Sequence, residues 1–337
     1  MPTALITGIT GMVGSHLLDF LIENTDWKIF GITRWRSPAS NIEHHFNTDY
    51  FNSRITYLEA DLLDYQSLLN AVTTAKPDYV FHLAAQSFPT TSFNIPIQTL
   101  DINILGTARL LEAIKFSGLD PWIHVCSSSE IFGRVKSIDL PIKENTRFQP
   151  ASPYSISKIG TDLLSVYYSQ AYNLKTISTR MFTHTGPRRG EVFAESAFAK
   201  QIALIEMGTI KPIINVGNLD SLRTWSDVRD AVRAYYVLLT NKPISGEVYN
   251  IGGTFTCTVG EMLDYLLSIS TFKEKIQIKQ NAKLIRPLDA DLQVPDISKF
   301  QNHTGWKPEI SFEKTMGDLL NYWRQCIQKQ EYRPFWT

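Results

Sequence analysis

Tyr154 and Lys158 form a Tyr-x-x-x-Lys motif directly after Pro153, a residue that suits the first turn of a helix. Side chains four residues apart on a helix lie on one face, about a turn from each other. An ammonium group beside a phenol favours the phenolate and lowers the tyrosine pKa from its usual ~10. We therefore predict that Tyr154 is a general base assisted by Lys158. By itself the motif is also common on surface helices.

The segment SSSEIFG, residues 127–133, places Glu130 just beyond the apolar run 122–126, which is typical of a buried strand. A carboxylate at that point needs water or a partner, because burying it unpaired is costly. Side chains alternate along a strand, so Ser128 and Glu130 are expected on the same face. The placement indicates a site; the alternative is a salt bridge at the end of the strand.

Three glycines, Gly8, Gly11 and Gly14, lie between the first predicted strand and the first predicted helix. Glycines permit a tight turn and a close approach of backbone to pyrophosphate, while the helix N-terminus supplies N–H groups and positive dipole. The pattern therefore indicates a dinucleotide loop, with glycines that only serve packing as the alternative.

The residues after the second predicted strand indicate which dinucleotide is preferred. An NAD site usually carries an acid there for the ribose hydroxyls, whereas this chain has Arg34, Trp35, Arg36 and Ser37. Guanidinium groups pair well with a 2′-phosphate, so NADP(H) is favoured and NAD(H) is the alternative. A solvated basic loop is the other interpretation. Asp61 and Leu62 follow the third strand, where adenine would lie, or form a plain turn.

The pattern around these motifs predicts the fold. Short β-branched runs at 4–7, 28–33, 55–60, 79–85, 122–128, 175–182 and 248–253 alternate with amphipathic stretches. This order predicts an α/β protein with a doubly wound parallel sheet and ligands at the carboxyl ends of its strands. Gly118 is the expected C-cap of the helix before residue 122. We expect residues 1–180, with a later strand near 224–253, to form the dinucleotide-binding core. Residues 181–337 would mainly form a smaller C-terminal substrate-binding lobe.

Composition excludes several classes of protein. The chain has 337 residues, with 33 Lys plus Arg and 33 Asp plus Glu, so no net field attracts nucleic acid or an anionic membrane. No apolar run approaches the roughly 20 residues that span a bilayer. Glycines begin within the first residues and leave no room for a signal peptide, so a cytoplasmic protein is expected. The three cysteines lack metal-site spacing, and no metal site is predicted.

Taken together, the motifs resemble the extended short-chain dehydrogenase/reductase family, whose core is a Rossmann fold. The carrying segments are GITGMVG (8–14), ADL (60–62), HLAAQS (82–87), SSSEIFG, SPYSISK (152–158), GPRRG (186–190), GNLDSLRTWSDVRD (217–230), RPLDAD (286–291) and GWKP (305–308). Within that family the chain is similar to the GDP-sugar enzymes, the GDP-mannose 4,6-dehydratases and the GDP-4-keto-6-deoxymannose reductases. The run after Arg189 is closer to the reductases, whereas IEHH (42–45) and GPRRG are closer to the dehydratases.

The resemblance implies a role for each matching residue. Implied catalytic residues are Ser128, Glu130, Tyr154 and Lys158. Implied cofactor contacts are Gly8, Gly11, Met12, Val13, Gly14, Arg34, Arg36, Asp61, Leu62, Ala84, Ala85, Tyr154, Lys158, His184 and Arg189. Implied substrate contacts are Ser87, Ser129, Thr183, Asn218, Arg223, Arg286 and Asp289. Packed core histidines and surface arginines are the alternative interpretations for His184, Arg189, Arg223 and Arg286. Thr183 stands where the family usually has asparagine.

The implied activity is 4,6-dehydration of a GDP-linked sugar, GDP-mannose or a GDP-manno-heptose. It would proceed by oxidation at C4, loss of water across C5 and C6, and return of hydride to C6. A GDP-sugar C4 oxidoreductase that does not remove water is the alternative, because the related reductases can also carry Ser-Ser-Glu. The resemblance further implies a homodimer or homotetramer.

Overall fold

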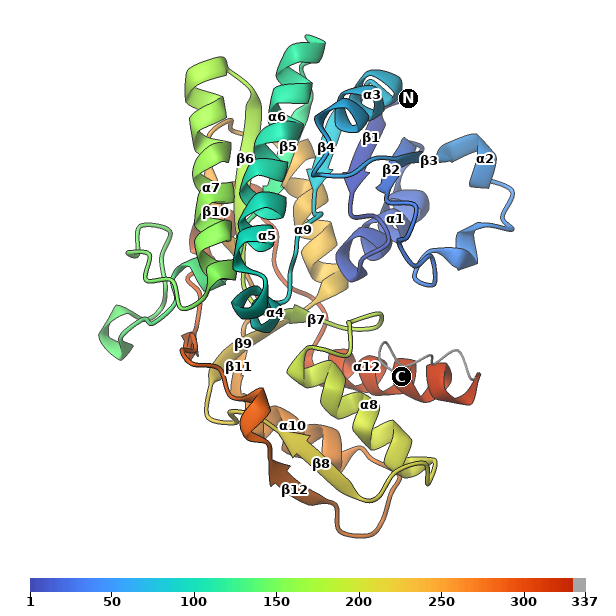
Figure 1. Cartoon of the computed structure of the whole chain (residues 1–337), viewed down its shortest axis with the longest axis vertical. Helices are drawn as coiled ribbons and strands as arrows, with labels where there is room; N and C mark the ends of the chain where they lie inside the picture. Colours follow the sequence, from blue (N-terminus) through green and yellow to red (C-terminus); the bar gives the residue numbers. More distant parts are fainter. Residues whose placement is uncertain (330–337) are drawn as a thin grey trace.

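The computed structural model describes residues 1–329, and within them seven strands form one parallel sheet (Figure 1). These strands are β1 (Thr3–Thr7), β2 (Lys28–Thr33), β3 (Ile55–Glu59), β4 (Tyr79–His82), β5 (Trp122–Cys126), β6 (Lys175–Met181) and β10 (Val248–Ile251). Their order is β10-β6-β5-β4-β1-β2-β3. Strands β2 and β3 are added on one side of β1 and the later strands on its other side, so the strand order reverses between β1 and β4. Ligands of doubly wound sheets bind at such a reversal. The predicted fold class is confirmed.

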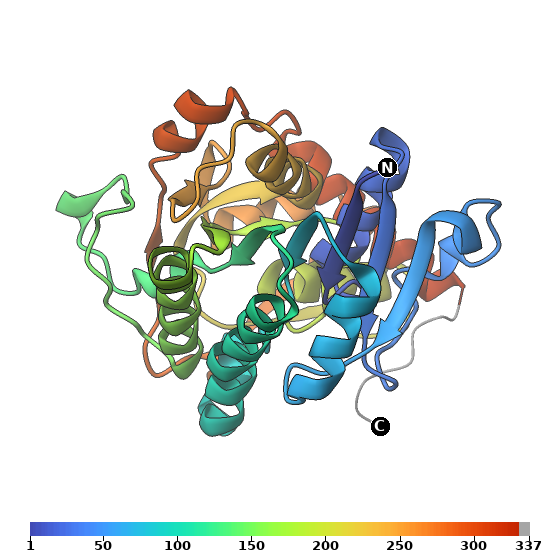
Figure 2. The same ribbon diagram turned by 90° about the horizontal axis from the view of Figure 1, so that it is seen from above.

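Helices cover both faces of the sheet, which explains why its strands are apolar on both sides. One face carries α3 (Tyr65–Ala75), α6 (Gly106–Ser117) and α7 (Pro153–Tyr172), and the other carries α1 (Met12–Asn24), α9 (Val228–Thr240) and α11 (Ser298–Thr304). Figure 2 shows teal α6 and green α7 on the side opposite the yellow-brown α9. Along β1, Ala4 and Ile6 join one core and Leu5 joins the other, as the alternation of strand side chains requires.

Local capping fixes the helix that carries the Tyr-x-x-x-Lys motif. The Ser152 hydroxyl accepts a hydrogen bond from the Ser155 N–H at 3.0 Å, and Pro153 occupies the first turn. Asn173 ends the helix in the left-handed conformation with φ 57°. Gly118 likewise caps α6 with φ 69°, as predicted. Tyr154 is therefore held in the first turn of α7, next to the carboxyl end of the sheet.

Several strands end earlier than their apolar runs. The runs 55–60, 79–85 and 122–128 stop as strands at Glu59, His82 and Cys126. The following residues turn instead of continuing the pleat, and they line a cavity at the carboxyl edge. Hydrophobic character alone does not mark this point, because the turn residues are small and partly buried.

The lobe, at the bottom of Figure 1, has smaller sheets and its own core. Its elements are β7 (His184–Thr185), α8 (Ala194–Glu206), β8 (Ile213–Val216), β9 (Leu222–Asp227), β11 (Phe255–Thr258), α10 (Val259–Ser268), β12 (Gln277–Gln280), β13 (Leu292–Gln293) and α12 (Phe312–Gln328). The shorter helices of the chain are η1 (Glu43–His45), α2 (Phe51–Arg54), α4 (Pro89–Asn94), α5 (Pro96–Leu100), η2 (Asp101–Leu105), η3 (Ser129–Ile131), η4 (Ser137–Asp139) and η5 (Ala282–Leu284). Strand β9 pairs with β7, β11 and β13, and of the predicted range 224–253 only β10 joins the large sheet. Residues 330–337, part of the predicted lobe, lie outside the described residues.

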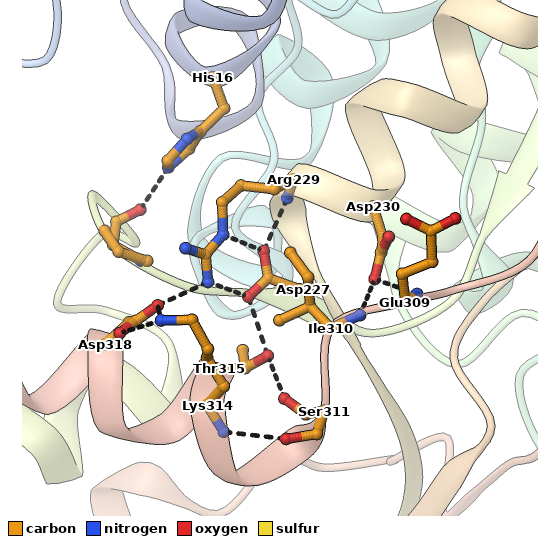
Figure 3. Close-up of polar contacts among 11 residues, drawn as sticks. His16, Asp227, Arg229, Asp230, Glu309, Ile310, Ser311, Lys314, Thr315 and Asp318 are labelled. Atoms are coloured by element: carbon orange, nitrogen blue, oxygen red, sulfur yellow. Dashed lines mark hydrogen bonds and ion pairs between the residues drawn. The ribbon is translucent and has the colours of Figure 1, made fainter.

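A polar network joins α12 to the start of α9 (Figure 3). The fully buried Asp227 carboxylate receives two hydrogen bonds from the Arg229 guanidinium, at 2.8 and 2.7 Å, and one from the Thr315 hydroxyl at 2.8 Å. Arg229 also pairs with Asp318 at 2.7 Å. Because a buried charge is tolerated only with partners, this network fixes α12 against α9.

Candidate active site

A cavity of about 1300 Å³ opens at the carboxyl edge of the large sheet and extends to the lobe. It brings together side chains from segments far apart in the sequence. The predicted residues that line it are Gly8, Gly11, Met12, Val13, Gly14, Arg34, Asp61, Leu62, Ala84, Ala85, Ser87, Ser128, Ser129, Glu130, Tyr154, Lys158, Thr183, His184, Arg189, Asn218, Arg223, Arg286 and Asp289. Of the predicted site residues, Arg36 alone does not line it.

The glycine loop has the conformation and the crowding that only glycine permits. Gly8 has φ +72°, and a Cβ there would lie 2.9 Å from the Ala84 backbone. A Cβ on Gly14 would lie 2.3 Å from the Gly8 carbonyl oxygen. Gly11 is the N-cap of α1 and has no side chain to offer to the first-turn N–H groups. This loop is a cradle in which backbone can approach a pyrophosphate.

A buried neutral network holds the turn after β4. The Thr7 hydroxyl accepts hydrogen bonds from the N–H groups of Leu83 and Ala84, at 3.1 and 3.0 Å. His82 lies between the hydroxyls of Thr7 and Thr107, each 2.9 Å from one ring nitrogen. Burial lowers the pKa of His82 to about 3, so the ring is neutral at physiological pH. The network positions Ala84 and Ala85 without placing a charge beside the glycine loop.

Tyr154 and Lys158 lie on the cavity wall, both largely buried. Burial raises the pKa of the Tyr154 phenol above its usual value, although a hydrogen bond with the Ser128 side chain opposes this shift. Lys158 donates from Nζ to the Cys126 carbonyl oxygen at 2.7 Å, and burial lowers its pKa. The predicted lowering of the tyrosine pKa is therefore wrong for this structure, because desolvation outweighs the Ser128 hydrogen bond and the nearby Arg189 charge.

Ser128 and Glu130 reach the cavity by a different route from the one predicted. Strand β5 ends at Cys126, and residues 129–131 form the short helix η3 with Ser128 as its N-cap. The Ser128 hydroxyl accepts a hydrogen bond from the Glu130 N–H at 3.2 Å. The expectation that strand alternation aligns these two residues is wrong. A helical turn aligns them, because Ser128 satisfies an N–H that the turn would leave unpaired.

Four charged side chains form a chain of ion pairs at the end of the cavity next to the lobe. Arg223 on β9 lies 3.7 Å from a Glu130 carboxylate oxygen through Nη1, and 3.4 Å from Asp289 Oδ1 through Nη2. Arg286 Nη1 is 3.2 Å from the same Asp289 oxygen. Glu130 thus forms an ion pair, which was the alternative interpretation of its position after the strand. Its partner, Arg223, nevertheless lines the cavity.

The two predicted arginines after β2 differ in position. Arg34 lines the cavity, and its backbone N–H donates to the Ser37 hydroxyl at 3.3 Å. Arg36 lies outside, with its guanidinium carbon 4.6 Å from the centroid of the exposed Trp35 ring. Stacking on that ring directs Arg36 away from the cavity. Ser37 and Asn41 also line the wall, and nothing in their local sequence distinguishes them as site residues.

His184 and Arg189 lie on the segment that leaves the large sheet for the lobe. Burial and the nearby Arg189 charge lower the pKa of His184 to about 4, and its Nδ1 is 3.1 Å from the Phe182 carbonyl oxygen. Arg189 pairs with Glu195 at 3.0 Å and stacks on Phe193 at 3.4 Å from the ring centroid. These protein contacts fix both residues in position.

Solved structures define the class to which this fold and cavity belong. A structure titled RMD from Pseudomonas aeruginosa, complexed with NADPH, superposes with a TM-score of 0.80 at 28% identity, covering 96% of this chain and 99% of that chain. The UDP-glucose 4-epimerase of Thermotoga maritima with UDP-glucose gives a TM-score of 0.83 at 25% identity, with 96% and 99% covered. The chain is an extended short-chain dehydrogenase/reductase, as predicted.

Sequence comparison defines the family more narrowly. The profile of the GDP-mannose 4,6 dehydratase family matches residues 5–319. GDP-mannose 4,6 dehydratase 2 of Arabidopsis thaliana is 35% identical over 328 residues, with 94% of this chain and 86% of the relative covered. GDP-mannose 4,6-dehydratase of Yersinia enterocolitica is 31% identical over 350 residues, with 95% and 93% covered. The chain belongs to the GDP-mannose 4,6 dehydratase family. The prediction of a GDP-sugar 4,6-dehydratase is confirmed, and the oxidoreductase alternative is not favoured.

Among residues 1–329, no helix combines the length and the apolar character needed to cross a membrane.

Proposed function

We propose that this chain removes water from a GDP-linked sugar with NADP(H) as its preferred cofactor, through Ser128, Glu130, Tyr154 and Lys158. One observation carries the proposal. Glu130, a second acid/base, lies in the same cavity as the Tyr154–Ser128 pair and beside the arginine cluster. A simple oxidation at C4 needs only one base, whereas loss of water across C5 and C6 needs a further group to move protons.

The cofactor end of the cavity fits a dinucleotide. The glycine cradle, the uncapped start of α1 and the turn at Ala84 and Ala85 leave room for a pyrophosphate against backbone. Arg34 and Ser37 on the wall suit a 2′-phosphate, which supports NADP(H) over NAD(H). Asp61, Leu62, His184 and Arg189 are the other proposed contacts. When bound, the nicotinamide would take hydride from C4 of the sugar and return it at C6.

Tyr154 is the proposed base for the C4 hydroxyl, with Ser128 hydrogen-bonding the same oxygen. Because burial disfavours the phenolate, Tyr154 depends on its hydrogen bond with Ser128 and on the Lys158 ammonium to accept a proton. Lys158 is itself anchored by the Cys126 carbonyl, which keeps it one turn from Tyr154. This arrangement protects the base from solvent and lets it act when the sugar is in place.

Glu130 is the proposed second acid/base. A ketone at C4 acidifies the proton on C5, and Glu130 removes that proton and then protonates the C6 hydroxyl, which leaves as water. When hydride returns to C6, Glu130, which has been reprotonated from solvent, gives a proton to C5, and the proton that Tyr154 took from the C4 hydroxyl passes to solvent. The sugar has then lost one water, its C4 hydroxyl has become a ketone, and its C6 carbon has become a methyl group.

Arg223 and Arg286 are the proposed ligands of the substrate diphosphate. Both guanidiniums lie on one Asp289 oxygen, so the two charges are already gathered at one point. A neutral chain needs such a local cluster to bind a dianion. Ser87, Ser129, Thr183, Asn218 and Asp289 are proposed to make the remaining polar contacts. This arrangement supports the proposed division into a cofactor core and a substrate lobe.

A homodimer is proposed through the outer faces of α6 and α7. Exposed apolar or aromatic side chains gather on these two helices: Phe116, Ile156, Leu163, Tyr167 and Tyr172. Large exposed apolar surfaces are uncommon on monomers and mark interaction sites. Light scattering after size exclusion should give twice the chain mass, and Leu163→Glu should shift it toward the monomer.

The function is tested by product mass. Purified protein with GDP-mannose and trace NADP⁺ should give a product lighter by one water, and the reaction in deuterated water should place deuterium at C5. A sugar that keeps its water, while cofactor is converted one for one, would overturn the dehydratase assignment. A C4 oxidoreductase requires no exchange at C5.

A further inference from the structure

Helix α1, which begins at the glycine loop, also contacts residues 187 and 188, on the segment that leaves the large sheet for the lobe. His16 and Asp19 are three residues apart on this helix and therefore share a face. His16 Nε2 lies 3.0 Å from the Pro187 carbonyl oxygen, the contact drawn from His16 in Figure 3. Burial and the nearby Arg188 charge lower the pKa of His16 to about 4, so the ring is neutral and donates from Nε2.

Asp19 is the centre of a denser set of contacts. Its Oδ1 lies 2.9 Å from His44 Nε2 and 2.7 Å from His45 Nε2, while its Oδ2 pairs with Arg188 Nη1 at 2.7 Å. Although burial opposes ionisation, the hydrogen bond from His45 and the Arg188 charge hold the pKa of Asp19 well below its usual range. The carboxylate is therefore ionised at every physiological pH.

Asp19, His44 and His45 are also a set of side chains whose donor atoms lie close enough to hold a metal ion. In this geometry, however, both imidazole nitrogens point at one carboxylate oxygen, and a guanidinium occupies the other. The donor atoms are hydrogen-bonded to each other, and the Arg188 charge would repel a cation. This geometry favours a structural cluster over a metal centre. We call the cluster of Asp19, His44, His45 and Arg188 the anchor.

The anchor joins three segments that line the cofactor end of the cavity. Asp19 belongs to the helix of the glycine loop, His44 and His45 follow the segment that carries Arg34, and Arg188 precedes Arg189. Arg188 itself lines the cavity, and among residues 1–329 its ion pair is with Asp19. Its φ of +66° is a left-handed conformation, which a non-glycine residue keeps only where its surroundings impose it. His16 and Asp19 contact residues 187 and 188 at this point.

We propose that Asp19 is a positioning residue for the dinucleotide, acting through Arg188, whose guanidinium supplies a cation for a phosphate of the cofactor. This inference rests on the proposed cofactor site. Asp19 occupies one nitrogen of the guanidinium and leaves the others for an anion. It also offsets part of the positive charge of Arg188. Residues 169 positions apart thereby act as one unit at the cofactor end.

The test measures cofactor binding directly, by titrating the full-length protein with NADPH and following nucleotide fluorescence. Asp19→Asn and Arg188→Gln should each weaken NADPH binding by about 5- to 20-fold. The double variant should bind no more weakly than the poorer single variant, because Asp19 acts through Arg188. GDP affinity should stay within about twofold of wild type, a result that general loosening of the fold would not give. Glu23→Gln, an exposed acid on the same helix, should leave NADPH binding unchanged.

A second variant covers the case in which Asp19→Asn does not fold. His44 is 46% exposed on its side chain, and His44→Gln should fold and weaken NADPH binding by about two- to threefold. Unchanged NADPH affinity in these variants, additive losses in the double variant, or an equal loss of GDP affinity would overturn the proposal. If wild-type protein bound neither NADPH nor NADH, the proposed cofactor site itself would be wrong.

Discussion

The two ends of the cavity are built in different ways. At the cofactor end, backbone turns at the ends of parallel strands form the wall, held by glycine packing and by the neutral Thr7–His82 network. At the substrate end, charged side chains form the wall: Glu130 follows β5, Arg223 lies on β9, and Arg286 and Asp289 lie between η5 and β13. One end is positioned by the sheet, and the other by ion pairs between separate segments.

The difference predicts different costs of binding. Backbone N–H groups at a helix start need little rearrangement to donate hydrogen bonds to a pyrophosphate. As the proposed ligands of the diphosphate, Arg223 and Arg286 would, in contrast, exchange some of their contact with Asp289 for it. The carboxylates keep two guanidiniums close together without leaving a buried charge unpaired. Variants at the proposed cofactor and catalytic residues should therefore affect dinucleotide binding and turnover, whereas variants of the arginines at the charged end should affect nucleotide-sugar binding.

The largest effect is expected at Tyr154, where the two ends meet. Tyr154→Phe and Lys158→Ala should each lower turnover by about 100-fold or more, because a general base or its supporting charge is lost. Product formation by mass spectrometry measures the loss, and circular dichroism checks folding. Tyr65→Phe, on α3 and outside the cavity, is the matched control. Near-normal turnover in Tyr154→Phe would refute its role.

Glu130→Gln should separate oxidation from water loss. Water loss should fall by about 100-fold, the scale of a lost acid/base, while hydride transfer to the cofactor remains detectable by the absorbance of reduced nicotinamide. In deuterated water the variant should fail to exchange at C5. If Glu130→Gln still released water at the wild-type rate, Glu130 would be a contact of Arg223 and not the second acid/base.

Arg223→Ala and Arg286→Ala should weaken the nucleotide sugar and spare the dinucleotide. Loss of a charged hydrogen-bonding group costs about 1.5 to 3 kcal/mol, or about 10- to 150-fold in affinity. Calorimetric titration with GDP-mannose and, separately, with NADPH gives both constants. Loss of NADPH binding in either variant would show that the two ends are not independent.

Arg34→Ala sharpens the comparison within the cofactor end. It should weaken NADPH by about tenfold and leave NADH almost unchanged, because only the former has a 2′-phosphate for a guanidinium. Arg36→Ala is the matched control, since Arg36 stacks on Trp35 outside the cavity. Equal losses for the two dinucleotides would remove the basis for an NADP preference.

The smallest effect concerns the lobe at acid pH. Burial opposes ionisation of Glu206, but hydrogen bonds from Arg324 and the Thr271 backbone lower its pKa to about 2. The folded value lies below the unfolded value of about 4.3, so this stabilisation is present above pH ~4.3 and is lost as pH falls toward ~2. Arg324→Gln should flatten that part of the melting-temperature profile, and Glu274→Gln should not. An unchanged profile would show that the pair does not stabilise the lobe.

The sequence was most informative where a signal is local. Gly8, Gly11 and Gly14 were predicted as site residues because they lie in one turn between a strand and a helix. Tyr154 and Lys158 were predicted because their spacing puts them on one face of a helix. Ser128 and Glu130 were found for the wrong local reason, because the apolar run does not show that β5 ends at Cys126. Arg36 was included because of its charge, although the adjacent Trp35 directs it away from the cavity. Ser37, Asn41 and Arg188 were missed, because no periodicity marks a loop residue as part of a wall.

The sequence by itself determined the alternation of strands and helices, the glycine loop and the identity of the proposed catalytic groups, because each depends on neighbours within a few residues. Only the tertiary structure decided the state of those groups. Desolvation of Tyr154 depends on every segment that covers it, so spacing to Lys158 gave the wrong direction for its pKa. The pairs Glu130–Arg223 and Asp19–Arg188 join residues far apart in the chain, and folding alone brings their charges within reach.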